Sequence, residues 1–311
     1  MLKMNLEKDP LNTLFLSPGV EDLMKFYNSF PDRDDLIGWM SGRHKSTPSM
    51  IQVQGDTTSV VVIPTADYNS ARTQTCSLKI FKGMQQIVVE SVKPKDVYFN
   101  YSHNVNIGIS KAMEFNPNWI IISNDDMTPS DPPNILLSEL KKADPDKYNV
   151  LFTREEGSYH SFPRFIGTPN SLYSVISTLH PNRLRKTRQE IWKKFGLKYI
   201  DAIDTGLTGL MSRFTYRYLK GHLLTGSFAI LSKNYINSVS KVYDETFING
   251  GEDTDLSLKL LKEPEKIGFI DYKIGDMVGT SLGSGWTRYI RNVVNEIYLS
   301  YKIEKGLTVY Q

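Results

Sequence analysis

The sequence predicts an α/β protein in which a mixed, mainly parallel sheet is flanked by helices. The first observation is a set of apolar, mostly β-branched runs at 59–63, 87–89 and 119–122. Such continuous runs predict strands that are covered on both faces. The second observation is that segments with helical spacing of apolar residues separate these runs, as is typical of a sheet built from βαβ units.

Composition narrows the class of protein further. A chain of 311 residues with 40% hydrophobic content can bury a substantial core. Its 37 basic and 34 acidic residues give a net charge of +3, too small to indicate a dedicated nucleic-acid binder. A single cysteine, Cys76, excludes an internal disulfide and fits a reducing compartment. With no signal-peptide pattern and no run of 18 apolar residues, we expect a cytoplasmic protein.

The first half of the chain predicts an extension followed by the start of the sheet. Residues 1–56 mix charged, proline and apolar residues, with one helix expected near 19–30. We then expect, in chain order, a strand–turn–helix–strand unit over 59–91, a short strand at 96–102, an amphipathic helix at 105–116 and a strand at 119–123. In the amphipathic helix, Ile107, Ile109, Ala112 and Met113 are expected to point inward.

The second half predicts further strands and helices around an insertion. We expect a helix from 134 to 148, with Ile135, Leu136 and Leu140 inward, and a strand at 149–155. Residues 155–221 do not follow this pattern and are expected to form an insertion. The remaining expectations are a strand, a helix, a glycine turn and a helix over 222–263, a strand within 266–276 and an amphipathic helix over 287–305. Accordingly, the chain divides into an extension (1–56), a core (57–278) and a C-terminal helix (279–311).

Two adjacent carboxylates follow the apolar strand at 119–123. Asp125 and Asp126 follow it after a single residue, Asn124, and prolines come later. Ligands of α/β sheets gather at the carboxyl ends of strands, where a carboxylate can offer a hard oxygen ligand to Mg²⁺ or Mn²⁺. A solvated turn is the plainer interpretation, and the pair alone does not decide between the two.

A second acidic group begins a predicted helix. The segment GGEDTDL places Glu252, Asp253 and Asp255 after two glycines. Acidic residues at the positive end of a helix dipole explain such a pattern without any catalysis. Three acids within four positions exceed what capping requires, and 252 and 255 share a helical face that 253 does not. A carboxylate that points into a cleft is a candidate general base.

A third group could hold a nucleotide. Thr65, Asp67 and Glu90 stand at the ends of the first two expected strands of the core. The sequence contains neither a Gly-x-Gly-x-x-Gly pattern nor a Gly-Lys-Ser/Thr pattern, so a dinucleotide-binding fold and a P-loop NTPase are unsupported.

The order of these segments carries a family resemblance. The segments VVVIPTADYNS, IVVES, NVNIGISKAME, WIIISNDDMTP and FINGGEDTDLSLKL occur in that order across about two thirds of the chain. The chain therefore resembles the inverting family 2 glycosyltransferases of the GT-A fold, a Rossmann-like fold of nucleotide-diphospho-sugar transferases. Members of that family typically show an I-P-T-Y-N strand, an N-x-G helix, a D-x-D motif and a late E-D-x-D.

The resemblance implies roles for individual residues. Thr65 and Asp67 would line the nucleotide pocket, and Glu90, where relatives usually carry Asp, would accept a hydrogen bond from the base. Asn124, Asp125 and Asp126 stand for D-x-D, so that Asp125 would lie near the ribose and the metal and Asp126 would be the main ligand of Mn²⁺ or Mg²⁺. Asp253 would be the catalytic base, and Glu252 would orient it or contact the acceptor.

One position departs from the family pattern. Many relatives carry a His after the last core strand that helps to hold the metal or the diphosphate, whereas this chain has GDMVGTSLGSGW there. The metal would then be held by Asp126, the diphosphate and water, or Arg288 would substitute electrostatically.

The resemblance also implies partners. The donor would be a UDP- or GDP-sugar, and the acceptor a saccharide, a lipid-linked molecule or a protein; no nucleic acid is expected. A cluster of basic residues falls within the insertion and is most simply a solvated helix, with peripheral contact to an anionic membrane as the functional alternative. The cluster comprises Arg183, Arg185, Lys186, Arg188, Lys193 and Lys194.

Two rival functions stay open. A sugar nucleotidyltransferase shares the broad fold and the metal but usually carries a glycine-rich G-x-G-x-R loop after the first strand, where this chain has PTADYNSARTQ. A protein that binds nucleotides or carbohydrates without turnover would fit the absent His and the Glu at position 90. Retention of Asp126 and Asp253 favours an enzyme over that binder.

Overall fold

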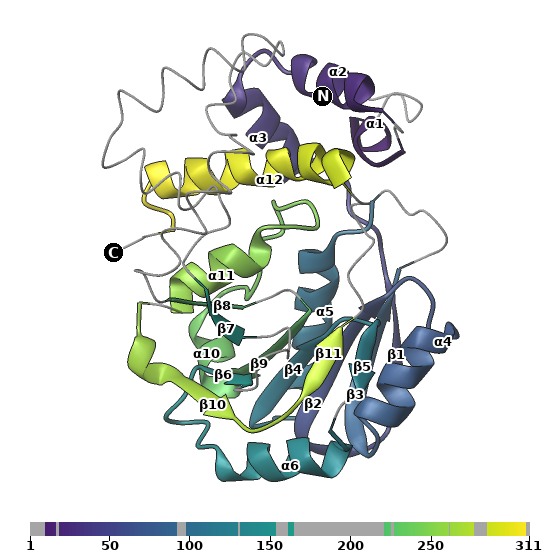
Figure 1. Ribbon diagram of the computed structural model, residues 1–311, viewed down its shortest axis with the longest axis vertical. Helices are drawn as coiled ribbons and strands as arrows, with labels where there is room; N and C mark the ends of the chain where they lie inside the picture. The colour runs from purple at the N-terminus through teal and green to yellow at the C-terminus, as the bar shows by residue number, and fades with distance from the viewer. Residues whose placement is uncertain are drawn as a thin grey trace.

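The computed structural model describes residues 10–16, 19–91, 98–129, 131–153, 161–164, 221–224, 227–260, 262–276 and 285–308. Within this part of the chain a seven-stranded sheet forms the centre of the molecule (Figure 1). Its strands, from one edge to the other, are β1 (Ser49–Val53), β3 (Met84–Glu90), β2 (Asp56–Thr65), β4 (Trp119–Ser123), β9 (Phe228–Ser232), β6 (Val150–Thr153) and β10 (Ile267–Ile270).

The sheet is mixed and mostly parallel, as the sequence predicts. β2 runs parallel to both β3 and β4, and β10 runs parallel to β6. β9 is antiparallel to both of its neighbours, and β1 is antiparallel to β3. The carboxyl ends of β2, β3 and β4 therefore meet at one edge, where Thr65 is in register with Glu90.

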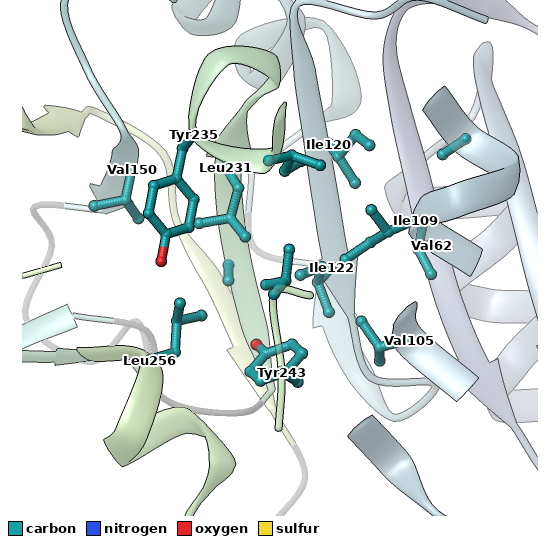
Figure 2. Close-up of a cluster of buried hydrophobic side chains, with 14 of the residues drawn as sticks. Val62, Val105, Ile109, Ile120, Ile122, Val150, Leu231, Tyr235, Tyr243 and Leu256 are labelled. Atoms are coloured by element: carbon teal, nitrogen blue, oxygen red, sulfur yellow. The ribbon is translucent and has the colours of Figure 1, made fainter. Parts of the chain in front are cut away.

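Helices cover both faces of the sheet. On one face lie α5 (Tyr101–Met113), α10 (Lys233–Ser238) and α11 (Glu252–Leu260), which pack against alternate strand residues such as Val62, Ile120 and Leu231 (Figure 2). On the other face lie α4 (Ala71–Thr75), a π-helical turn (Cys76–Ile80) and α6 (Pro133–Lys142). All five residues of β4 are buried, which confirms the predicted strand with two covered faces.

A third group of helices lies beyond α5 and α11 (Figure 1). We call it the helical layer; it consists of α1 (Pro10–Leu16), α2 (Val20–Asn28), α3 (Arg33–Gly42) and α12 (Gly285–Glu304). Its apolar side chains share one cluster with Phe247, Ile248 and Leu258 of the core. The extension and the C-terminal helix thus pack together, on the side from which α11 begins.

Two small antiparallel pairs complete the described strands. β5 (Met127–Pro129) pairs with β11 (Ile274–Asp276), and β7 (Ser161–Arg164) pairs with β8 (Gly221–Leu224). A 3₁₀ turn (Pro264–Lys266) precedes β10. The segments at 222–232 and 266–276, each predicted as one strand, therefore form two short strands apiece.

Several local predictions are wrong. Over the described part of 96–102 there is no strand, because Asn100 caps α5 by accepting a 2.9 Å hydrogen bond from His103 N. Ile135 is 37% exposed, since α6 buries only Leu136 and Leu140. Within α5, Ile107 and Met113 are partly buried while Ile109 and Ala112 are fully inward.

The boundary at residue 57 also needs correction. β1 lies within residues 1–56 yet belongs to the central sheet as its edge strand. Its short sequence SMIQV is mostly polar or exposed, as suits an edge strand with one paired side, so the apolar pattern that marks a central strand is absent.

Candidate functional site

The acidic turn after β4 is held on both sides. Asn124 N donates to Ser227 O at 2.8 Å, which ties the turn to the residue before β9. The Cys76 thiol lies 3.7 Å from Asn124 O and 3.5 Å from Met127 O, the carbonyls that precede and follow the two aspartates in the sequence. Burial raises the pKa of Cys76 to about 12, which keeps this thiol protonated and able to donate. Asp125 and Asp126 are therefore fixed rather than placed on a solvated turn, and each is 9% exposed.

Asp125 faces the end of β2. Thr65 Oγ1 donates to Asp125 Oδ2 at 2.7 Å, and Thr73 Oγ1 lies 3.3 Å from the same oxygen. Arg72 Nη2 approaches that oxygen to 3.5 Å with a side chain that remains 45% exposed. The structure thus brings Thr65 and Asp125 together, and it adds Arg72 and Thr73, which no sequence signal indicated.

Glu90 and Asp67 stand beside this pair. Glu90 Oε1 accepts from Tyr68 N at 2.9 Å, which holds the turn after β2 against the end of β3. Asp67 Oδ1 accepts from Asn69 N at 3.0 Å, and Asp67 N donates to Thr65 Oγ1 at 3.1 Å. Thr65, Asp67, Glu90 and Asp125 therefore line one edge of the sheet, as the positions of their strands predicted.

The second acidic group separates into two environments. Asp255 is 1% exposed and forms ion pairs with Lys259 at 2.8 Å and with Lys302 of α12 at 2.8 Å. It also accepts a hydrogen bond from Thr308. Asp255 is consequently a structural residue that joins α11 to the helical layer.

Glu252 and Asp253 differ from Asp255. Glu252 is 5% exposed, and its Oε2 has no hydrogen-bond partner within the described residues. Asp253 is partly exposed and accepts a 2.8 Å hydrogen bond from Thr254 N. Burial, reinforced by the neighbouring charge of Asp253, raises the pKa of Glu252 to about 8. Of the adjacent carboxyls, Glu252 is thus the one whose ionisation burial opposes most clearly.

The loop that leads to these residues is fixed by asparagines. Asn106 of α5 accepts from Tyr243 N at 3.1 Å and donates to Tyr243 O at 2.8 Å. Asn295 of α12 forms the same two hydrogen bonds with Ile248: it accepts from Ile248 N at 2.7 Å and donates to Ile248 O at 2.9 Å. Gly251 closes the loop with φ +84°, a conformation that side chains rarely adopt. Two helices, α5 and α12, thus hold the loop from which α11 begins.

Carboxylates of both acidic groups affect the pKa of one phenol, Tyr101. Burial raises the pKa of Tyr101 well above its ordinary value, and the nearby Tyr243, Glu252, Asp253 and Asp126 reinforce that rise. Asp126 after β4 and the Glu252–Asp253 pair that begins α11 therefore both affect the electrostatics of this phenol. The Tyr101 and Tyr243 rings pack edge to face there, 6.0 Å apart. Neither tyrosine was indicated by the sequence.

The described residues do not by themselves form a complete metal centre. Among them, no three His, Cys, Asp or Glu side chains group in the manner of a metal site. Asp125 and Asp126 supply carboxylate oxygens at one turn, and Asp125 Oδ2 is already engaged by Thr65. A hard cation takes six or more oxygen ligands, so here it would need several from a bound ligand and water.

Other predicted features lie outside the described residues. These are the basic cluster, most of the insertion at 155–221 and most of the segment where relatives carry a His. Arg288 falls in α12, but its side chain is not described. No helix in the described ranges combines the length and the apolar character that crossing a membrane requires.

Comparison with known proteins adds no assignment. No protein-family model matches the chain, and a search of curated proteins finds no significant match.

Proposed function

We propose that the chain is a metal-dependent inverting glycosyltransferase that moves a sugar from a nucleoside-diphosphate donor to an acceptor hydroxyl. The observation that carries the proposal is that Thr65 fixes Asp125 at the end of the sheet, next to Asp126, while Asp126, Glu252 and Asp253 all raise the pKa of Tyr101. A transferase of this kind needs a cation-binding carboxylate and a general base around one bound donor. The mixed, mainly parallel sheet flanked by helices is the sheet expected of a GT-A fold.

The donor side of the site would lie at the ends of β2, β3 and β4. Thr65, Asp67, Glu90 and Asp125 offer hydroxyl and carboxylate oxygens there, which suit the N–H groups of a base and the hydroxyls of a ribose. Asn124 stands beside them at the start of the acidic turn. Arg72, whose Nη2 lies 3.5 Å from Asp125 Oδ2 and whose side chain is 45% exposed, would face the diphosphate.

The residues fit a divalent cation that binds together with the donor. Asp126, and Asp125 through the oxygen that Thr65 does not occupy, would hold Mn²⁺ or Mg²⁺, with the remaining ligands from the diphosphate and water. When bound, the cation would neutralise the charge that grows on the departing nucleoside diphosphate.

Asp253 is the better candidate for the base. Of the adjacent pair, Glu252 is buried and its pKa is raised by burial, whereas Asp253 is partly exposed. A pair of carboxylates in unequal environments separates the roles of acid and base. Asp253 would take the proton from the acceptor hydroxyl as that hydroxyl attacks the anomeric carbon, a contribution of about 10² to 10⁴ in rate. Attack from the face opposite the leaving group inverts the configuration.

The partners follow from the same proposal. The donor is a UDP- or GDP-sugar, and the acceptor is a saccharide, a lipid-linked molecule or a protein. A lipid-linked acceptor would give the basic cluster at 183–194 a role in contacting an anionic membrane.

The decisive experiment measures release of nucleoside diphosphate. Purified protein is incubated with a panel of UDP- and GDP-sugars, acceptors and Mn²⁺, and the expected result is release that requires both metal and acceptor. Asp253→Asn should abolish release while donor binding by calorimetry is retained, and Asp126→Ala should lose the metal-dependent part of donor binding. Asp146→Asn, an exposed carboxylate after α6, is the matched control and should behave as wild type.

The same assay separates the rival functions. Donor binding without release by wild type would identify a binding protein. Formation of a sugar nucleotide from a nucleoside triphosphate and a sugar phosphate, with release of pyrophosphate, would identify a nucleotidyltransferase. Equal loss of binding and release in Asp253→Asn would assign that residue to binding instead of proton transfer.

A further inference from the structure

Arg43 connects the helical layer to the loop that precedes α11. It follows the last residue of α3 and is 9% exposed. Its Nη1 donates to Met40 O at 2.7 Å and to Thr246 O at 2.8 Å, and its Nη2 donates to Phe247 O at 2.6 Å. One guanidinium thus fastens the end of α3 to two consecutive carbonyls of a loop that lies 204 residues away along the chain.

Arg43 also contributes to the electrostatic environment of Glu252. Burial lowers the pKa of Arg43 to about 10, while the charges of Asp244, Glu245 and Glu252 oppose that change, so the group remains charged at neutral pH. The influence is mutual, because Arg43 lowers the pKa of Glu252. Ending a helix does not require a buried cation that is bound to backbone carbonyls and surrounded by carboxylates.

Neighbouring contacts run through the same junction. Lys45 Nζ lies 3.2 Å from Glu245 Oε2, and Ser46 N donates to Tyr98 O at 3.0 Å. Ser46 Oγ is 3.3 Å from Ser91 Oγ, at the end of β3. Residues 43–46 therefore contact both the loop before α11 and the segments at the carboxyl end of β3.

We propose that Arg43 is a positioning residue for the Glu252–Asp253 pair. The N-terminal extension, which carries Arg43, thereby contributes to the geometry of the site. The effect of Arg43 on catalysis rests on the proposed transferase function, whereas its hold on the loop before α11 is a property of the fold. Because the loop carbonyls are held by a planar fork, only Arg supplies both the charge and the paired geometry.

The test compares three variants of the whole chain. Arg43→Met removes the fork and the charge, and Arg43→Lys restores the charge without the fork. Arg291→Met is the matched control, since Arg291 also joins two elements through a carbonyl, Leu14 O at 3.0 Å, but this bond lies within the helical layer. Hydrogen exchange is followed at the amides of 246–248, which are bonded to Asp244, to Asp244 O and to Asn295 in turn.

The expected results separate positioning from general loosening. In Arg43→Met the amides of 246–248 should exchange at least about tenfold faster, with α6 unchanged. The turnover number should fall about 10- to 100-fold at unchanged donor KM, because the base is misplaced while the donor side is intact. Arg43→Lys should recover part of both, and Arg291→Met should leave both as in wild type. If Arg43→Met does not fold, Arg43→Lys carries the same comparison.

Two results would overturn the inference. One is wild-type exchange at 246–248 in Arg43→Met, and the other is an equal loss of turnover in Arg291→Met. If wild-type protein transfers no sugar from any nucleotide donor, the proposed function fails, and the exchange comparison alone then decides whether Arg43 positions the loop.

Discussion

The hydroxyl of Thr65 donates a 2.7 Å hydrogen bond to Asp125 Oδ2, which joins the end of β2 to the acidic turn after β4. Both residues are buried, and the register of β2 on β4 brings the two strand ends together. A neutral hydroxyl thereby fixes one carboxylate oxygen of Asp125 and leaves the other oxygen available to a ligand.

Thr65→Val should weaken both the turn and donor binding. The substitution keeps the shape but removes the donor, so that among the described residues Asp125 Oδ2 retains the longer contacts with Thr73 and Arg72. We expect the free energy of unfolding to fall by about 1–3 kcal/mol and donor affinity to fall about tenfold. Urea unfolding and calorimetry measure the two effects.

Thr75→Val is the control for that change. The Thr75 hydroxyl donates within its own helix to Ala71 O at 2.8 Å. Its donor affinity should equal that of wild type, and a tenfold loss there as well would mean that α4 as a whole, and not the Thr65–Asp125 bond, sets the affinity.

Glu252→Gln should change how stability depends on pH. The folded pKa of Glu252 is raised from 4.5 to about 8, so the native state binds more protons than the unfolded state between these values. The stabilisation is complete below about 4.5 and is lost as pH rises towards 8. Wild type should therefore lose thermal stability relative to Glu252→Gln across this window, as measured by Tm in a series of buffers.

Asp253→Asn provides the internal check on that titration. The charge of Asp253 reinforces the raised pKa of Glu252, so its removal should move the window to lower pH. If the Tm profiles of wild type and Glu252→Gln run parallel, the pKa of Glu252 is not raised in the folded protein. The distinction between Glu252 and Asp253 as candidates for the base then fails.

Gly108→Ala should disrupt the packing of α5 on the sheet. A Cβ there would lie 2.4 Å from Val62 Cγ1 and 2.8 Å from Val89 Cγ2, so α5 or both strands must shift. We expect the free energy of unfolding to fall by about 1–3 kcal/mol. Because Asn106 on the same helix holds Tyr243, faster amide exchange at Tyr243 should accompany the loss.

Gly38→Ala is the matched substitution in α3. No heavy atom of a described residue lies within 4 Å of the position that a Cβ at residue 38 would occupy, so only helix propensity changes and stability should rise by up to about 1 kcal/mol. Destabilisation of similar size in both variants would contradict the close-packing argument at Gly108.

The sequence predicted those parts of the fold and site that local patterns determine. The unbroken apolar run at 119–123 identified β4, and its end located Asp125 and Asp126. Strand ends likewise located Thr65 and Glu90. Apolar spacing identified the helix at 105–116, in which Asn106 holds the loop before α11 while Gly108 permits close approach to β2 and β3.

Contacts between distant segments could not be predicted in this way. Helical spacing separates Asp253 from Glu252 and Asp255, but it does not show that Asp255 pairs with Lys302, which lies in another helix. Arg43 stands in a polar stretch with no periodicity, and its partners are 203 and 204 residues away. Tyr101 falls in the segment 96–102 that was predicted as a short strand; the cap formed by Asn100 makes it the first residue of α5 instead.

Lys302→Met should be the most destabilising of these substitutions. Lys302 is 4% exposed and lies 2.7 Å from Asp244 Oδ2 and 2.8 Å from Asp255 Oδ1, so its removal leaves two carboxylates without their shared cation. A loss of about 3–5 kcal/mol in the free energy of unfolding is expected, measured by urea titration. Lys305→Met is the control and should change stability by less than about 0.5 kcal/mol, because Lys305 is exposed and lies over the Tyr301 ring.

The pH dependence of the Lys302 network gives the sign of the effect. Lys302 is the main charge that lowers the pKa of Asp244 from 3.8 to about 2, against the opposing effect of burial. The stabilisation from Asp244 is therefore present above about 3.8 and is lost as pH falls towards 2. Wild type should lose stability over this acid range more steeply than Lys302→Met, because the variant has already lost the interaction that protonation removes. Parallel acid-unfolding curves for the two proteins would show that Lys302 does not hold Asp244 in its ionised form.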